Sequence, residues 1–184
     1  MRVFLALELP GPIKEYLSMV TKTMSQRVSG VKWVKAEGIH VTLKFFGEIE
    51  EKKVQEIVGA LQGINKQHMA MPVQLKEIKA FPDLMRPRVI VVTFQEGVDN
   101  VKAIFHDIES CLLAVGIQKE KRGFAPHITI GRVKDVAPLL KMNIVPLEEK
   151  RFLLDNLVLY QSTLTREGAL YAPLKEIKLE RNIE

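Results

Sequence analysis

Cysteine and long apolar runs are the two features that this sequence most clearly lacks. A single cysteine among 184 residues excludes an intrachain disulfide bond. No apolar stretch approaches the roughly 20 residues that a membrane-spanning helix requires. Glu8 and Pro10 interrupt the apolar N-terminal segment, which we interpret as a strand and not as a signal peptide. We therefore expect a cytoplasmic protein with no attachment to a membrane.

The charge balance and the length set broad limits on function. Lys and Arg number 27 against 22 Asp and Glu, which gives a net charge of +5. This mild excess suits an anionic ligand such as nucleic acid, but many proteins with the same balance bind no polyanion. With 47% hydrophobic residues, the chain is long enough for one domain with a real core or for two small lobes packed together.

Histidine is also scarce, yet two of the four histidines stand in the same short pattern. Residues 40–43 (His-Val-Thr-Leu) and 127–130 (His-Ile-Thr-Ile) both alternate a polar residue with an aliphatic one. Because side chains alternate faces along a strand, His and Thr share one face in each segment. The two motifs start 87 residues apart, close to half the chain length. This separation predicts a weak internal repeat in which two similar lobes face each other.

The periodicity of apolar residues predicts more strands than helices. Helices do not alternate with strands one for one, and no Pro/Gly/Ser-rich linker divides the chain. We therefore predict an α+β fold of antiparallel or mixed sheets, organised as one bilobal domain over residues 1–184. The predicted helices cover 12–26, 50–63 and 98–114, with room for a short one over 135–142. The predicted strands cover 2–8, 31–34, 39–47, 72–79, 88–94, 125–133, 151–160 and 170–180, with loops over 81–87 and 161–168.

The two motif histidines are the best candidates for chemistry. If the lobes pair face to face, His40 and His127 meet across a cleft. Histidine titrates near neutral pH, so one imidazole can accept a proton while the other donates one. Such a pair suits in-line displacement at phosphorus, where nucleophile and leaving group lie on opposite sides. Thr42 and Thr129 lie on the same faces and can donate hydrogen bonds to phosphate oxygens.

Three residues beside the motifs have placements that alternation alone leaves open. Arg132 falls on the face opposite the second motif histidine, unless a β-bulge at Gly131 reverses the alternation and turns its guanidinium toward a phosphate. Lys44 shares the face of the first motif histidine, either at the rim of the cleft or, as we favour, in solvent. Phe46 shares that face as well, as a residue of the cleft floor or as a stacking partner for a base.

The remaining candidates have ordinary structural explanations. His68 lies in a predicted loop and His106 on the polar side of the 98–114 helix. Neither histidine belongs to a metal-ligand spacing, so we predict no metal site. Cys111 falls on the apolar stripe of the same helix, as expected for a core thiol. For Trp33, packing between strand and helix is favoured over stacking on a base.

The doubled His-x-Thr-x motif resembles the paired signature of the 2H phosphoesterase superfamily. Within it, the chain resembles the RNA 2′,3′-cyclic phosphodiesterases once called 2′-5′ RNA ligases. The doubled motif at this separation is specific, whereas each flanking match is weak alone. The resemblance runs nearly end to end and includes residues 2–7, 31–34, 40–48, 81–82, 86–90, 126–132 and 159–162.

This resemblance implies a bilobal 2H phosphoesterase fold, with two pseudo-symmetric lobes, helices outside and the histidines in a central cleft. It implies no metal and no cofactor. The implied ligand is an RNA or nucleotide with a 2′,3′-cyclic phosphate. No protein partner is implied, and we expect a monomer.

The resemblance also implies a reaction and a role for each site residue. The reaction is hydrolysis of the 2′,3′-cyclic phosphate to a 2′-phosphomonoester. His40 would donate a proton to the departing 3′ oxygen, and His127 would activate water as a base. Thr42, Thr129 and Arg132 would hold the phosphate. Reversible 2′-5′ joining of RNA ends is an associated side activity.

Two alternatives stay open at this point. One is a related 2H phosphodiesterase that acts on another cyclic phosphate or removes nucleotides from RNA 3′ ends. The other is an RNA-binding module that uses a basic cleft without chemistry. The second alternative predicts salt-sensitive RNA binding that does not depend on the two histidines.

Overall fold

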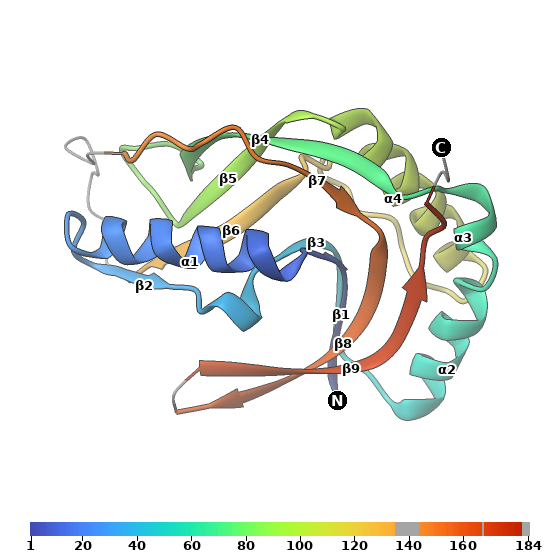
Figure 1. Ribbon diagram of the computed structural model, residues 1–184. Coiled ribbons are helices and arrows are strands. Elements are labelled where there is room, and N and C mark those ends of the chain that lie inside the picture. The colour runs from blue at the N-terminus through green and yellow to red at the C-terminus, as the bar shows by residue number, and fades with distance from the viewer. Residues whose placement is uncertain (135–143, 167, 182–184) are drawn as a thin grey trace.

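The computed structural model describes residues 1–134, 144–166 and 168–181, and Figure 1 shows its course. The predicted short helix over 135–142 lies outside the described residues. The helical elements are α1 (Gly11–Ser25), η1 (Ala36–Gly38), α2 (Glu51–Ala60), α3 (Ile64–Gln67) and α4 (Val98–Leu113). The strands are β1 (Arg2–Glu8), β2 (Val31–Trp33), β3 (His40–Glu48), β4 (Met71–Phe81), β5 (Val89–Glu96), β6 (His127–Val133), β7 (Arg151–Leu154), β8 (Asn156–Thr165) and β9 (Gly168–Lys178).

The strands form two sheets, in agreement with the predicted bilobal α+β fold. One sheet has the order β3-β1-β8-β9 and the other the order β2-β6-β5-β4-β7. Every pairing between these strands is antiparallel. In Figure 1, α1 lies along the β2 and β6 side of the second sheet, whereas α2, α3 and α4 gather at the other end of the molecule. The predicted α+β fold is thus confirmed, and all the pairings between its named strands are antiparallel.

The internal repeat appears in the order of the elements. The segment β1-α1-β3 matches β5-α4-β6, because each contains a strand, a long helix and a motif strand in this order, although β2 and η1 are inserted before β3. In both segments the motif strand pairs antiparallel with the strand that opens the segment. Apolar residues of both segments join one hydrophobic cluster, which includes Leu5, Leu43, Ile90 and Ile130. Burial of the aliphatic faces against one another therefore leaves the His and Thr faces outside the core.

The structure differs from the predicted elements at three places. The predicted strand over 151–160 is divided at Asp155 into β7 and β8, which join different sheets. Within the predicted loop over 161–168, residues 161–165 continue β8 and pair antiparallel with β9, since cross-strand pairing outweighs the polar composition. The predicted helix over 50–63 ends at Ala60, and Gly63 adopts a left-handed φ of 86° before α3. No helix among the described residues has both the length and the apolar character needed to cross a membrane.

Candidate active site

The two motif strands meet at the junction of the two sheets. Strands β3 and β6 contact each other, although they belong to different sheets. Their polar faces open into one cleft with a volume of about 1260 Å³. Five of the six predicted site residues line this cleft: His40, Thr42, His127, Thr129 and Arg132. Segments far apart in sequence therefore bring two imidazoles, two hydroxyls and a guanidinium to one space.

Each motif histidine is oriented by the carbonyl two residues before it. His127 Nδ1 lies 2.7 Å from the carbonyl oxygen of Ala125. The imidazole of His40 hydrogen-bonds the backbone of Gly38. A carbonyl oxygen can only accept, so Nδ1 of His127 carries a proton and Nε2 is the nitrogen that can exchange one. A hydrogen bond to the backbone two residues earlier thus orients the imidazole in both halves of the repeat.

The surroundings of the two imidazoles differ. His40 stacks on Phe4 with ring centroids 4.9 Å apart and meets the edge of Tyr171 at 5.5 Å. His127 has one aromatic neighbour of this kind, Phe81, at 5.7 Å within the described residues. Burial, together with the positive charges of Lys14 and Arg132, lowers the pKa of His40 to about 4. The free protein therefore carries a neutral His40 at neutral pH.

The acidic side chain of Glu8, on the neighbouring strand, partly opposes the lowering of the His40 pKa. Glu8 is the cross-strand partner of His40, and its negative charge acts to raise the pKa of the imidazole. The Glu8 carboxylate accepts hydrogen bonds from Lys14 Nζ at 2.7 Å and from Asn156 Nδ2 at 3.1 Å. Although burial favours the neutral acid, these donors hold the pKa of Glu8 below its usual value. The charge near His40 is therefore a fixed ion pair and not a lone carboxylate.

A β-bulge follows the threonine in both motif strands and decides which side chains reach the cleft. In the β1–β3 ladder, Ala6 pairs with Thr42 and Leu5 with Lys44, so the register skips Leu43. The β5–β6 ladder skips the equivalent residue, Ile130. Each bulge reverses the alternation of the residues after it. The predicted bulge is present, one residue before Gly131.

The bulges bring one residue of each strand into the cleft that strict alternation would turn away. Arg132 lines the cleft after the second bulge, as the bulge hypothesis predicted. At the equivalent place in β3, Phe45 lines the cleft and is 59% exposed. Phe46, the predicted base contact, instead packs against the hydrophobic core and is not among the cleft residues. The placement predicted for Phe46 is wrong because the bulge at Leu43 exchanges the faces.

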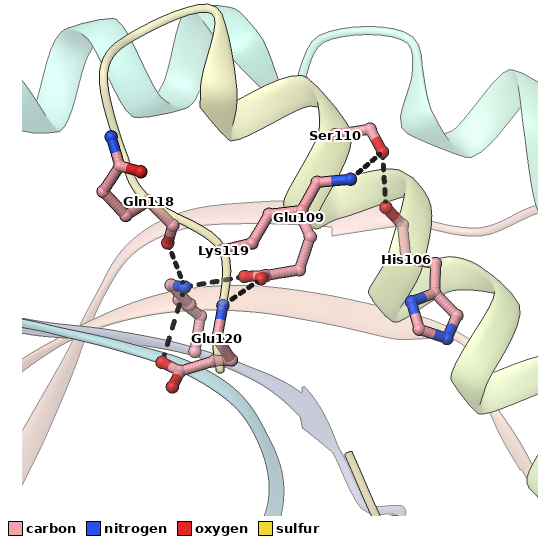
Figure 2. A network of polar contacts seen from close by, with 7 residues as sticks. His106, Glu109, Ser110, Gln118, Lys119 and Glu120 are labelled. Carbon is pink, nitrogen blue, oxygen red and sulfur yellow. Dashed lines mark hydrogen bonds and ion pairs between the residues drawn. The ribbon is translucent and has the colours of Figure 1, made fainter. Parts of the chain in front are cut away.

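The same bulge accounts for an unexpected buried lysine. Lys44 is only 5% exposed, so both placements considered for it, the cleft rim and the solvent, are wrong. Its ammonium group lies 2.7 Å from Glu109 of α4, 3.4 Å from Glu120 and 2.8 Å from the carbonyl oxygen of Gln118. Figure 2 labels these three partners. Sequence periodicity gives no signal for this cluster, since its partners lie more than 60 residues from Lys44.

Several cleft residues lie outside the motifs, where strand alternation gives no information, although the basic loop over 119–122 could be expected either to bind a nucleic-acid backbone or to lie in solvent. Tyr171 of β9 and Phe4 of β1 contact the ring of His40. Four arginines besides Arg132 line the cleft: Arg2, Arg86, Arg88 and Arg122. A periodic pattern identifies a strand face but not which residues of other strands complete it. Within the described residues, no three His, Cys, Asp or Glu side chains gather closely enough to hold a metal ion.

Comparison with known proteins gives matches over nearly the whole chain. The family model described as LigT like Phosphoesterase matches residues 7–91 and 93–171, and each stretch contains one His-x-Thr-x motif. The RNA 2′,3′-cyclic phosphodiesterase of Methanocaldococcus jannaschii is 35% identical over 181 residues, which cover 96% of this chain and 99% of the relative.

Solved structures agree with the fold. A crystal structure of a Thermus thermophilus protein aligns with a TM-score of 0.79 at 23% identity and covers 100% of both chains. Escherichia coli LigT complexed with 3′-AMP aligns with a TM-score of 0.78 at 21% identity and covers 97% of both chains. At these identities the two structures establish a shared fold.

Proposed function

This chain belongs to the LigT-like phosphoesterase family, and from that membership we propose that it hydrolyses a 2′,3′-cyclic phosphate at an RNA or nucleotide end to a 2′-phosphomonoester. The observation that carries the proposal is the meeting of two carbonyl-oriented imidazoles in a single arginine-lined cleft. A pair of imidazoles in one cleft supplies a proton acceptor and a proton donor to the same phosphorus. A module that only binds RNA has no need of either orientation.

In the proposed reaction, a water molecule attacks phosphorus and its proton passes to Nε2 of His127. The bond from phosphorus to the 3′ oxygen breaks, and His40 donates a proton to that oxygen. The products are a 2′-phosphomonoester and a free 3′-hydroxyl. The imidazoles then exchange one proton with solvent to regain their starting states.

Protonation of His40 is the demanding part of this scheme. Its pKa of about 4 leaves few protonated molecules in the free protein at neutral pH. An anionic phosphodiester next to the imidazole adds a negative charge that opposes those of Lys14 and Arg132, and so raises the pKa. We propose that substrate binding itself charges His40, so that the proton donor forms only when the phosphate is in place.

The polar groups around the histidines complete the phosphate site. Thr42 and Thr129 would donate hydroxyl hydrogen bonds to the non-bridging oxygens, and Arg132 would bind them in bidentate fashion. Phe45, exposed in the cleft, takes the base-contact role that the sequence suggested for Phe46. An exposed aromatic ring beside a phosphate site is a suitable stacking platform for a nucleobase.

The experiment that tests the proposal is turnover of a 2′,3′-cyclic nucleotide by the purified protein in the presence of a chelator. The expected product is the 2′-phosphomonoester, which phosphorus NMR distinguishes from the 3′-isomer. Absence of turnover, turnover that needs a divalent cation, or a 3′-phosphate product would each overturn the proposal. A panel of other cyclic phosphates tests the related-enzyme alternative.

A sulfur substitution separates the roles of the two histidines. When sulfur replaces the 3′ leaving oxygen, departure needs little help from an acid. The activity of His40→Ala on this substrate should recover toward that of the wild type, while His127→Ala stays inactive. If the activity of His127→Ala recovered instead, His127 would be the proton donor and His40 the base.

The same step also supports joining of RNA ends. If the 5′-hydroxyl of a second RNA replaces water as the attacking group, the reaction forms a 2′-5′ phosphodiester with the same proton transfers. We propose that the protein acts as a monomer in the cytoplasm. The single cysteine is compatible with that reducing compartment.

A further inference from the structure

We propose that Arg122 forms a second phosphate subsite, which binds the phosphodiester that precedes the cyclic phosphate in an RNA chain. The inference rests on the proposed function and extends it from the reacting phosphate to its neighbour in an oligonucleotide. It rests on the size and charge of the cleft and on the rigid attachment of the loop that carries Arg122.

The cleft is larger and more basic than one cyclic nucleotide requires. Its volume of about 1260 Å³ exceeds the roughly 300–1,000 Å³ of typical small-molecule sites. Among the described residues, five arginines line it and one acidic residue does so, Glu120, whose carboxylate lies 3.4 Å from Lys44 Nζ. A single reacting phosphate uses Arg132 and the two threonines. The remaining guanidinium groups therefore fit further phosphates of a longer chain.

The loop before β6 is held in place by the buried cluster around Lys44. Lys44 Nζ donates to the carbonyl of Gln118 at 2.8 Å, and the backbone N–H of Glu120 donates to Glu109 Oε2 at 2.5 Å. Glu109 is only 3% exposed, so these contacts lie away from solvent. Figure 2 shows how the loop passes between β3 and α4 at this point. The first anchor of the loop thus ends two residues before Arg122.

A second anchor begins two residues after it. The ring of Phe124 stacks on that of Phe105 in α4, with centroids 4.1 Å apart and an interplanar angle of 14°. The next residue, Ala125, accepts the hydrogen bond that orients His127. Arg122 therefore lies on a short bend between two fixed points. The same loop therefore carries both Arg122 and the carbonyl that orients the ring of His127.

Arg122 is free to bind a ligand, and its neighbour Lys121 provides a natural control. Arg122 is exposed, lines the cleft and has no ion-pair or hydrogen-bond partner among the described residues. Lys121 is also exposed and carries the same charge, but it does not line the cleft. A guanidinium can bind a phosphodiester in bidentate fashion. A general effect of positive charge would depend on both residues, whereas a subsite depends on Arg122.

The deciding experiment compares substrates of different length. Measure kcat/KM for a 2′,3′-cyclic mononucleotide and for a trinucleotide with the same cyclic end, in the wild type, Arg122→Ala and Lys121→Ala. Arg122→Ala should lower kcat/KM for the trinucleotide on the order of tenfold, as expected for a charged hydrogen bond. It should leave the mononucleotide within about twofold of the wild type. Lys121→Ala should change neither.

Binding of the corresponding products gives a readout that does not need turnover. Arg122→Ala should weaken binding of a 2′-phosphorylated trinucleotide by a similar factor and leave binding of a nucleoside 2′-monophosphate unchanged. Equal losses for short and long ligands, equal losses in the two variants, or no loss at all would overturn the subsite. If the wild type did not turn over the mononucleotide, the proposed function would be contradicted. The binding comparison would then still test whether Arg122 forms a phosphate subsite.

Discussion

At the scale of single residues, the two motif histidines have the same local geometry and unequal surroundings. His40 is packed against the rings of Phe4 and Tyr171 and lies near Lys14, whereas His127 meets the edge of Phe81. Two equivalent imidazoles can divide the work of acid and base only if their environments differ. The sequence showed the equivalence, but the difference comes from residues of β1, α1 and β9.

The lowered pKa of His40 predicts how stability depends on pH. Above pH 6.5 the imidazole is neutral in both folded and unfolded chains. Between pH 6.5 and about 4 the unfolded chain gains a proton that the folded chain does not, so stability falls by at most about 3 kcal/mol. His40→Asn should therefore lose less stability than the wild type across this window, as measured by denaturant unfolding. Parallel pH curves for the two proteins would contradict the prediction.

At the scale of elements, the paired bulges decide which side chains belong to the site. Alternation correctly placed His40 and Thr42 up to the bulge and failed for Lys44 and Phe46 beyond it. On the second strand Gly131 marks a place where a bulge can form, so the sequence allows Arg132 to face the cleft. On the first strand the equivalent residue is Lys44, which gives no such signal. Packing against α4, and not local sequence, places Lys44 inward.

Substitution of Gly131 tests the importance of the second bulge. A Cβ atom at this position would lie 2.7 Å from Val31 Cγ1 and 3.2 Å from the ring of Trp33. Gly131→Ala should lower stability by about 1–3 kcal/mol and reduce turnover, because the crowding displaces the adjacent Arg132. The second substitution Val31→Ala should restore much of both. A fully stable and active single variant would show that the strand tolerates the added methyl group.

Removal of Lys44 tests the cluster that joins β3 to α4. Lys44→Met leaves Glu109 buried without its cation, and this should cost about 3–5 kcal/mol in thermal or denaturant unfolding. In Lys44→Met/Glu109→Gln no buried charge is left unpaired, because Glu120, the other acidic partner of Lys44, is exposed to water. Most of the loss should therefore be recovered. Equal stability of the single variant and the wild type would mean that water reaches the cluster.

At the scale of the whole molecule, each sheet combines strands from both halves of the chain. Strands β8 and β9 complete the sheet of β1 and β3, while β4 joins the sheet of β5 and β6. The sequence predicted the repeat and the α+β class, because the motifs and the strand count are local signals. It could not predict this exchange, because a periodic pattern identifies a strand but not the sheet that the strand joins.

This exchange of strands predicts how the protein unfolds. Because neither half can form its sheet alone, we propose that residues 1–184 make one cooperative bilobal unit. Fluorescence of Trp33, which lies in the five-stranded sheet, should report the same denaturant midpoint as far-UV circular dichroism, which reports both sheets. Two separate midpoints would show that the lobes unfold independently.

The proposed reaction depends on the cooperation of His40 and His127. The most direct measurement is kcat on a 2′,3′-cyclic nucleotide, in chelator, for His40→Asn, His127→Asn and the double variant. Each single variant should lose about 10²–10⁴-fold in kcat with little change in its melting temperature at pH 7.5. The double variant should lose little more than the worse single variant, because the two residues act as a unit. Wild-type turnover in either single variant would contradict the paired mechanism.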